Sequence, residues 1–132
     1  MNTISVLYAE DEFSNRELLR IKFENAGLHA DIVCNGTEAV DLCRKRQYDA
    51  VLLDHYMGEP DGIQTARMIR GIDPLIPLIA ITSDDSLKNE MREAGFNHII
   101  IKPLRGNTVV TLLAEICNKK RAASGSPFKA GD

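Results

Sequence analysis

The chain has 132 residues, and its 44 % hydrophobic and 27 % charged residues are typical of one globular domain of ordinary size. Its 16 Lys and Arg against 19 Asp and Glu give a formal net charge of −3, which argues against nucleic acid as the main partner because phosphate binding needs a basic face. No apolar run approaches the length of a membrane span, and the N-terminus lacks the basic-then-apolar order of a signal peptide, so we expect a cytoplasmic protein that contacts no membrane.

Short apolar runs alternate with helical patterns along the chain. Strands are predicted at 3–9, 28–34, 50–54, 75–81 and 99–101, the second of them weaker and half polar. Helices are predicted at 14–26, 37–46, 63–69, 86–94 and 108–120. Gly27, Gly71 and Gly95 are expected to end the first, third and fourth helices. Pro77 lies inside the fourth strand pattern, so the start of that strand should be irregular.

The C-terminal residues differ in composition from the rest of the chain. Residues 121–132 are rich in Ala, Gly and Ser and lack an apolar periodicity, so a disordered tail is expected there. We therefore divide the chain into a domain at 1–121 and a tail at 122–132.

The alternation of apolar strands and helices predicts a fold class. Strands that are apolar throughout are buried on both faces, which is typical of a parallel sheet between two layers of helices. Right-handed crossovers make such a sheet an open, doubly wound α/β structure. Five βα units at this length favour a flavodoxin-like (βα)5 fold with the strand order 2-1-3-4-5.

Cysteine and histidine give little sign of a metal or disulfide framework. Cys34, Cys43 and Cys117 are an odd number, lie far apart and form no CxxC motif, which fits a reducing compartment. The three histidines do not cluster with them, so a zinc site is not expected.

Polar side chains stand where four of the predicted strands end. Open α/β sheets bind ligands beyond the carboxyl ends of their strands, so these residues should converge in space. They are Glu10 and Asp11 after the first strand, Asp54 after the third, Thr82 after the fourth and Lys102 after the fifth.

This set of residue types indicates a particular chemistry. Three carboxylates at close range repel one another unless a cation lies between them, and an all-oxygen cluster suits Mg²⁺. A lysine and a hydroxyl beside the carboxylates add capacity for further negative charge. The set therefore favours a phosphoryl group on or near a carboxylate.

The sequence resembles the receiver domain of two-component response regulators, of the kind found in chemotaxis regulators, across residues 3–120. The matching motifs are Glu10-Asp11, Asp54, Asp61-Gly62, Thr82 and Lys102-Pro103, and residues 35–39 and 94–96 also resemble the usual sequence of the family. Each piece is weak alone, but their order and their places at strand ends make a strong signal.

The resemblance implies a metal site. Asp11 would bind Mg²⁺ directly, Glu10 would act through a metal-bound water, and Asp54 would be a further ligand. The main-chain carbonyl of Tyr56 would complete the protein ligands, and Mn²⁺ is expected to substitute for Mg²⁺.

The resemblance also implies a phosphoryl-transfer switch. Asp54 would be the phosphoacceptor, Lys102 would pair first with Asp54 and then with phosphate, and Thr82 would move toward the phosphoryl group. The bond to Pro103 is expected to be cis. Such a domain assists its own phosphorylation and dephosphorylation but has no external metabolic substrate, so we do not expect an enzyme in the ordinary sense.

The sequence departs from the family's common pattern in four places. The acidic pair is Glu-Asp, Gly58 stands where a proline is common, and Ser83 stands where a small apolar residue is usual. Ile99 occupies the position of the usual switch aromatic, which places the coupling between Thr82 and that aromatic in question.

A histidine kinase or a histidine phosphotransfer protein is the expected partner, docking on the helix that starts near Phe13. Phosphorylation is expected to change the surface of the fourth helix, fifth strand and fifth helix, which a downstream protein target or a second phosphorylated copy would bind.

Two alternatives stay open: a degenerate receiver that signals without phosphorylation, and a receiver excised from a hybrid histidine kinase. A flavodoxin is disfavoured because the acids at 10–12 would repel a cofactor phosphate. A metal-dependent phosphoryl-transfer enzyme is disfavoured because it would need an acid two residues after Asp54, where this chain has Tyr56.

Two residues beside Asp54 add hypotheses of their own. His55 could act as a base, although its position favours a side chain that faces solvent or a helix. Tyr56 and Asp84 are expected to tune how easily water reaches an acyl phosphate.

Overall fold

The computed structural model describes residues 3–123, with side chains described as far as residue 119. The strands are β1 (Ser5–Ala9), β2 (His29–Val33), β3 (Ala50–Asp54), β4 (Leu78–Thr82) and β5 (His98–Ile101). The helices are α1 (Phe13–Asn25), α2 (Gly36–Lys45), α3 (Gly62–Ile72), α4 (Lys88–Ala94) and α5 (Thr108–Ala123), with a single 3₁₀ turn, η1 (Asp85–Leu87), before α4.

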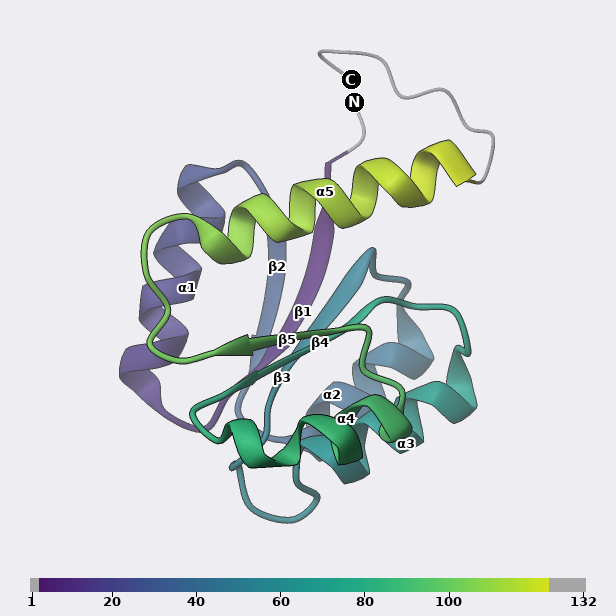
Figure 1. Cartoon of the computed structure of the whole chain (residues 1–132). Coiled ribbons are helices and arrows are strands. Elements are labelled where there is room, and N and C mark those ends of the chain that lie inside the picture. The colour runs from purple at the N-terminus through teal and green to yellow at the C-terminus, as the bar shows by residue number, and fades with distance from the viewer. Residues whose placement is uncertain (1–2, 124–132) are drawn as a thin grey trace.

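The five strands form one parallel sheet in the order β2-β1-β3-β4-β5, which confirms the predicted doubly wound, flavodoxin-like topology. Figure 1 shows α1 and α5 on one face of the sheet and α2, α3 and α4 on the other. Strand order reverses between β1 and β3, so the carboxyl ends of these two strands open onto a shared crevice.

Successive residues of each strand point into different layers of the core. Leu7, Val51 and Leu53 pack beneath α2, α3 and α4. Tyr8 and Leu52 pack instead beneath α1 and α5. This alternation has a period of two residues, so the residue that follows each strand inherits a defined side of the sheet.

Several boundaries differ from the predicted ones for identifiable reasons. Helix α3 starts with a capping box of Asp61 and Gln64, and it continues through Gly71 to Ile72 because Ile69 is fully buried and Ile72 packs against the same core layer. Strand β4 starts three residues later than predicted, since Pro77 offers only its carbonyl, which accepts from Val51 N at 2.9 Å.

The fourth and fifth helices also depart from the expectation. The predicted helix at 86–94 is a 3₁₀ turn followed by the seven-residue α4, with Asp84 as the cap of the turn, and Gly95 ends α4 with a φ of +109°. Helix α5 extends to Ala123 rather than Lys120, so the first residues of the predicted tail are helical, and the remainder of that tail lies outside the described residues.

Among the described residues, no helix is both long enough and apolar enough to cross a membrane.

Candidate functional site

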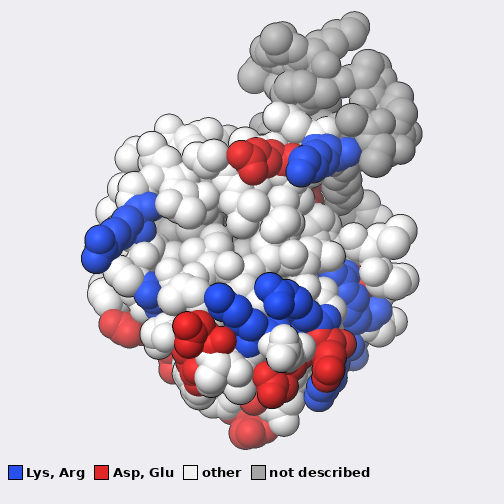
Figure 2. Space-filling model, in the orientation of Figure 1, with Lys and Arg blue, Asp and Glu red and all other residues white. Residues whose placement is uncertain are grey.

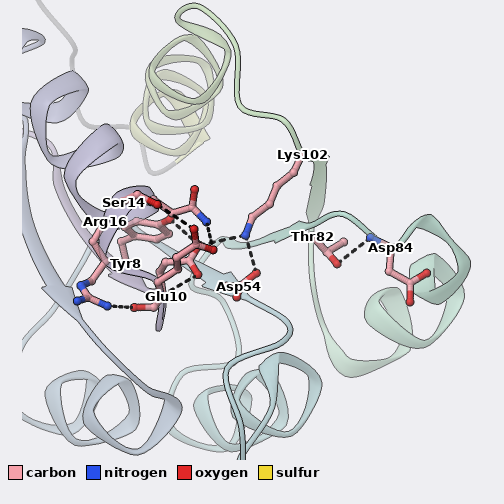
Figure 3. A network of polar contacts seen from close by, with 10 residues as sticks. Tyr8, Glu10, Ser14, Arg16, Asp54, Thr82, Asp84 and Lys102 are labelled. Atoms are coloured by element: carbon pink, nitrogen blue, oxygen red, sulfur yellow. Dashed lines mark hydrogen bonds and ion pairs between the residues drawn. The ribbon is translucent and has the colours of Figure 1, made fainter.

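Three acidic side chains converge at the carboxyl ends of β1 and β3. Glu10, Asp11 and Asp54 each offer a carboxylate oxygen, and these oxygens all lie within 4.8 Å of one another. Glu10 and Asp54 are 1 % and 4 % exposed, whereas Asp11 is open to solvent. The cluster therefore has two buried carboxylates and one accessible carboxylate. Figure 3 shows Glu10 and Asp54 together with the Lys102 side chain that points toward them.

Strand alternation explains why Glu10 and Asp54 meet. Asp54 follows Leu52 by two residues and Glu10 follows Tyr8 by two, so both acids point to the side of the sheet that faces α1 and α5. The two strands are neighbours in parallel register, with Ala9 opposite Leu53. Their polar end residues thus come together without any insertion in either strand.

Lys102 supplies a cation to the buried pair. Its ammonium donates to Oδ1 of Asp54 and to Oε1 of Glu10, each at 3.1 Å. The backbone N–H of Lys102 donates to the carbonyl of Thr82 at 2.8 Å, which ties the residue to the end of β4. The Lys102–Pro103 peptide bond is cis, as the resemblance implies.

Burial sets the proton affinity of the central acid. Burial, together with the neighbouring Glu10 carboxylate, raises the pKa of Asp54 to about 7, although Lys102 works in the opposite direction. Burial acts to lower the pKa of Lys102, but attraction to Asp54 and Glu10 outweighs it and leaves that pKa above its ordinary value. Asp54 is therefore poised to lose a proton when positive charge arrives.

The donor set fits a hard divalent cation. Every candidate ligand is a carboxylate oxygen, and neither a histidine nor a cysteine belongs to the cluster. Mg²⁺ prefers such oxygen ligands and is commonly held by one or two carboxylates and water. The accessible Asp11 would bind it, with Asp54 and Glu10 beneath.

Glu10 is held by two residues, Tyr8 and Arg16, that the sequence did not predict to belong to the site. The hydroxyl of Tyr8 donates to Oε1 of Glu10 at 3.1 Å, and Arg16 Nη1 donates to the carbonyl oxygen of Glu10 at 2.9 Å. Tyr8 lies two residues before Glu10 on the same strand face, so the strand period already contained the signal for this contact.

The remaining predicted residues border the cluster. Thr82 is fully buried at the end of β4, one residue beyond the partner of Asp54 in the sheet, and its hydroxyl oxygen accepts from Asp84 N at 3.1 Å. The hydroxyl of Tyr56 donates to Oδ2 of Asp84 at 2.6 Å and so joins the loops that follow β3 and β4. The Tyr56 carbonyl as a metal ligand stays a prediction.

His55 is placed differently from part of its prediction. The side chain is 6 % exposed, so it does not face solvent. It continues the alternation of Leu53 toward the core layer of α2–α4, and its ring meets the Tyr56 ring edge-on at 4.6 Å. Its Nδ1 is buried with no hydrogen-bond partner in the described part of the chain.

Comparison with known proteins agrees with this geometry. Residues 6–114 match the family model of the response regulator receiver domain. The chain belongs to this family.

Curated relatives differ greatly in length. The chain is 31 % identical over 116 residues to the two-component response regulator 24 of Arabidopsis thaliana, covering 86 % of this chain and 84 % of that protein. It is 33 % identical over 131 residues to the transcriptional regulatory protein ResD of Bacillus subtilis, covering 98 % of this chain but 53 % of ResD. It is 28 % identical to the osmosensing histidine protein kinase SLN1 of Saccharomyces cerevisiae over 87 % of this chain, which is only 10 % of that kinase.

Solved structures share the fold. The receiver domain of a sensor histidine kinase from Pseudomonas aeruginosa, which holds a magnesium ion in its active-site cleft, superimposes with a TM-score of 0.82 at 24 % identity, covering 89 % of this chain and 99 % of that domain. A receiver domain protein from Methanospirillum hungatei gives a TM-score of 0.86 at 17 % identity, covering 92 % of this chain and 99 % of that one.

Proposed function

We propose that this receiver domain is a phosphorylation switch in which Asp54 accepts a phosphoryl group with the help of Mg²⁺. The observation that carries the proposal is the contact of one buried carboxylate, Asp54, with both a cation and an acidic cluster: Lys102 lies 3.1 Å from it, and Glu10 and Asp11 lie within ligand-sharing distance. The magnesium-bound receiver of the Pseudomonas kinase supports Mg²⁺ as the metal, and Mn²⁺ should replace it.

The transfer step is a displacement at phosphorus. A carboxylate oxygen of Asp54 forms a bond to phosphorus while the bond from phosphorus to the donor breaks, and the donor's electron pair leaves with its histidine nitrogen or acetate oxygen. Glu10, Asp11 and Asp54 would hold Mg²⁺, which would supply positive charge to offset the charge of the transferring oxygens. Lys102 pairs with the ionised Asp54 beforehand and can then donate to the phosphoryl oxygens. The chain thus promotes its own modification and has no external metabolic substrate.

The face around α1 is the proposed docking site for the phosphoryl donor, a histidine kinase or a histidine phosphotransfer protein. Phe13, Leu18 and Ile21 expose 66 %, 39 % and 48 % of their surface there. A hollow of about 390 Å³ connects Leu18 with Lys102, and it is lined by Asn15, Leu18, Ser83, Lys102, Pro103 and Leu104. An apolar helix face next to the reactive carboxylate suits a helical partner that presents phosphohistidine. A cytoplasmic location follows from the same proposal, because such kinases draw on ATP.

The proposed output face comprises α4, β5 and α5. Figure 2 shows this face, with uncharged side chains across its middle and charged side chains gathered over α4. Ile101 on β5 is 37 % exposed, and Ile99 packs against the buried layer beneath α4. A phosphoryl group adds about two negative charges beside Thr82, and the turn Asp85–Leu87 connects that residue to α4. The resulting population shift would alter the surface offered to a target protein or a second copy.

Acetyl phosphate tests the proposal directly. With Mg²⁺ present, intact-mass spectrometry should show the addition of one phosphoryl group, which EDTA prevents and which Mn²⁺ supports. Asp54→Asn should abolish the adduct. Asp61→Asn is the matched control, because Asp61 is an acid of the neighbouring loop whose capping role asparagine can keep. If the wild type gains no phosphoryl group and beryllofluoride also leaves its NMR spectrum unchanged, the result points instead to a receiver that signals without phosphorylation.

A further inference from the structure

A buried tyrosine hydroxyl lies beneath the acidic cluster. Tyr8 is fully buried in β1, and its ring meets Phe23 of α1 edge-to-face, with centroids 6.3 Å apart. A buried hydroxyl is costly unless it is hydrogen-bonded. The Tyr8 hydroxyl has a single proton to donate, and it donates that proton to Oε1 of Glu10 (Figure 3).

The Glu10 side chain is held by three donors. Oε1 accepts from the Tyr8 hydroxyl and from Lys102, both at 3.1 Å, while Oε2 accepts from Glu12 N at 3.4 Å. The backbone carbonyl of the same residue accepts from Arg16. Glutamate has one more rotatable bond than aspartate, so a carboxylate at this position needs more restraint to occupy one place. The restraint comes from a residue on the same strand face, two positions earlier.

We propose that Tyr8 is a positioning residue for Glu10. The buried hydroxyl of Tyr8 holds the longer glutamate side chain in the place where the Glu10 carboxylate serves the metal-binding cluster. The inference rests on the proposed function, because it assigns Tyr8 a part in Mg²⁺ binding. It also explains how the Glu-Asp pair of this chain can work: the carboxylate of an aspartate at position 10 would lie one methylene nearer the backbone, away from the hydroxyl. Tyr8 is therefore matched to glutamate, and its effect should vanish when residue 10 is shortened.

A double-mutant cycle tests this match. MgCl2 is titrated into wild type, Tyr8→Phe, Glu10→Asp and the double variant, with the dissociation constant taken from backbone amide shifts around residues 11 and 54. Tyr8→Phe should weaken Mg²⁺ binding about five- to tenfold in the wild-type background, since a hydrogen bond to a buried carboxylate is lost. In the Glu10→Asp background the same change should alter the constant less than twofold. Tyr48→Phe is the matched control, because its hydroxyl also donates to a carboxylate, Asp31, at 2.5 Å but lies outside the cluster.

The outcomes separate the inference from the proposed function. The inference is overturned if Tyr8→Phe changes the Mg²⁺ dissociation constant less than twofold, or by the same factor in both backgrounds. The proposed function stays intact in either case, provided that the wild type binds Mg²⁺. A wild type that shows no response to Mg²⁺ removes the proposed function and this inference with it. Should Tyr8→Phe fail to fold, the ¹³Cζ resonance of Tyr8 in the wild type gives a second readout. That resonance should shift on MgCl2 addition, whereas an unmoved signal overturns the inference.

Discussion

The ammonium of Lys102 lies 3.1 Å from Oδ1 of Asp54, although β3 and β5 are not neighbours in the sheet. Strand β4 separates them, so the lysine side chain reaches across the end of β4 to meet the acid. A contact of this kind forms only beyond the carboxyl ends of the strands, where the backbone of β4 no longer lies between the two residues. It gives Asp54 a cation from within the chain.

Replacing Lys102 by methionine removes that cation while keeping a long side chain. We expect phosphorylation by acetyl phosphate to slow by about tenfold or more, because the lost charge-assisted hydrogen bond stabilised both the ionised acid and the transferring oxygens. Initial rates from intact-mass spectrometry measure the effect. Lys45→Met, at an exposed lysine in the last turn of α2, is the control and should keep the wild-type rate. Equal rates for both variants would contradict the role of Lys102.

Asp54 should make the metal-free protein less stable as the pH rises. Its pKa of about 7 in the folded chain lies above the ordinary 3.8, so between these values the folded chain keeps a proton that the unfolded chain has lost. The free energy of unfolding therefore falls from about pH 4 to about pH 7, by a few kcal/mol at most. Asp54→Asn should flatten this slope and exceed the wild type in stability at pH 8. Urea denaturation at pH 5 and pH 8 measures both, and an unchanged slope in the variant would refute the prediction.

Magnesium should reverse that loss of stability. Because the metal needs the ionised form of Asp54, its binding is expected to strengthen as the pH rises through about 7. The thermal midpoint should therefore rise more on MgCl2 addition at pH 8 than at pH 5.5, and EDTA should restore the lower value. Asp11→Asn removes the accessible carboxylate and should abolish the shift. Equal shifts at both pH values would show that Asp54 is not among the ligands.

The bond between Tyr56 and Asp84 joins the two loops that flank Asp54. Tyr56→Phe removes this 2.6 Å bond and keeps the ring, whereas Tyr56→Ala removes both. We expect the acyl phosphate to hydrolyse about two- to tenfold faster in Tyr56→Phe and faster still in Tyr56→Ala, since the loops no longer restrict water. Decay of the phosphorylated mass after removal of acetyl phosphate measures the rate. Tyr48→Phe should decay like the wild type, and so should Tyr56→Ala if the idea is wrong.

Two glycines of α3 should respond to alanine in opposite ways. A Cβ at Gly62 would lie 2.7 Å from the Cα of His55 and 2.8 Å from the carbonyl oxygen of Asp54, so backbone at the site must move. Gly62→Ala should cost about 2 kcal/mol or more of stability and also slow phosphorylation. A Cβ at Gly71 meets nothing within 4 Å, and Gly71→Ala should stabilise the helix by about 0.5–1 kcal/mol. Urea denaturation of both variants checks this, and a neutral Gly62→Ala would contradict the close packing.

The order of apolar runs was enough to predict the five strands, and the geometry of parallel sheets then placed their carboxyl ends together. Glu10, Asp11 and Asp54 could be assigned to one cluster on that basis, because Asp54 ends one strand and the other two are the first residues after a neighbouring strand. Helix ends were less predictable. Gly71 looked like a stop, but burial of Ile69 and packing of Ile72 against the core outweigh the weak helix propensity of one glycine.

The hydrogen-bond partners around the site depend on how the layers pack. The sequence could place Tyr8 and Glu10 on one strand face, yet their bond depends on tertiary packing, because Tyr8 is fully buried against Phe23 of α1. The reach of Lys102 across β4 and the burial of His55 likewise depend on three-dimensional packing. Periodicity along a chain specifies which residues leave each strand and on which side, since it reflects local backbone geometry. Which of those side chains share a proton, a cation or a hydrogen bond depends on solvent exclusion by residues distant in the chain, and that required the folded structure.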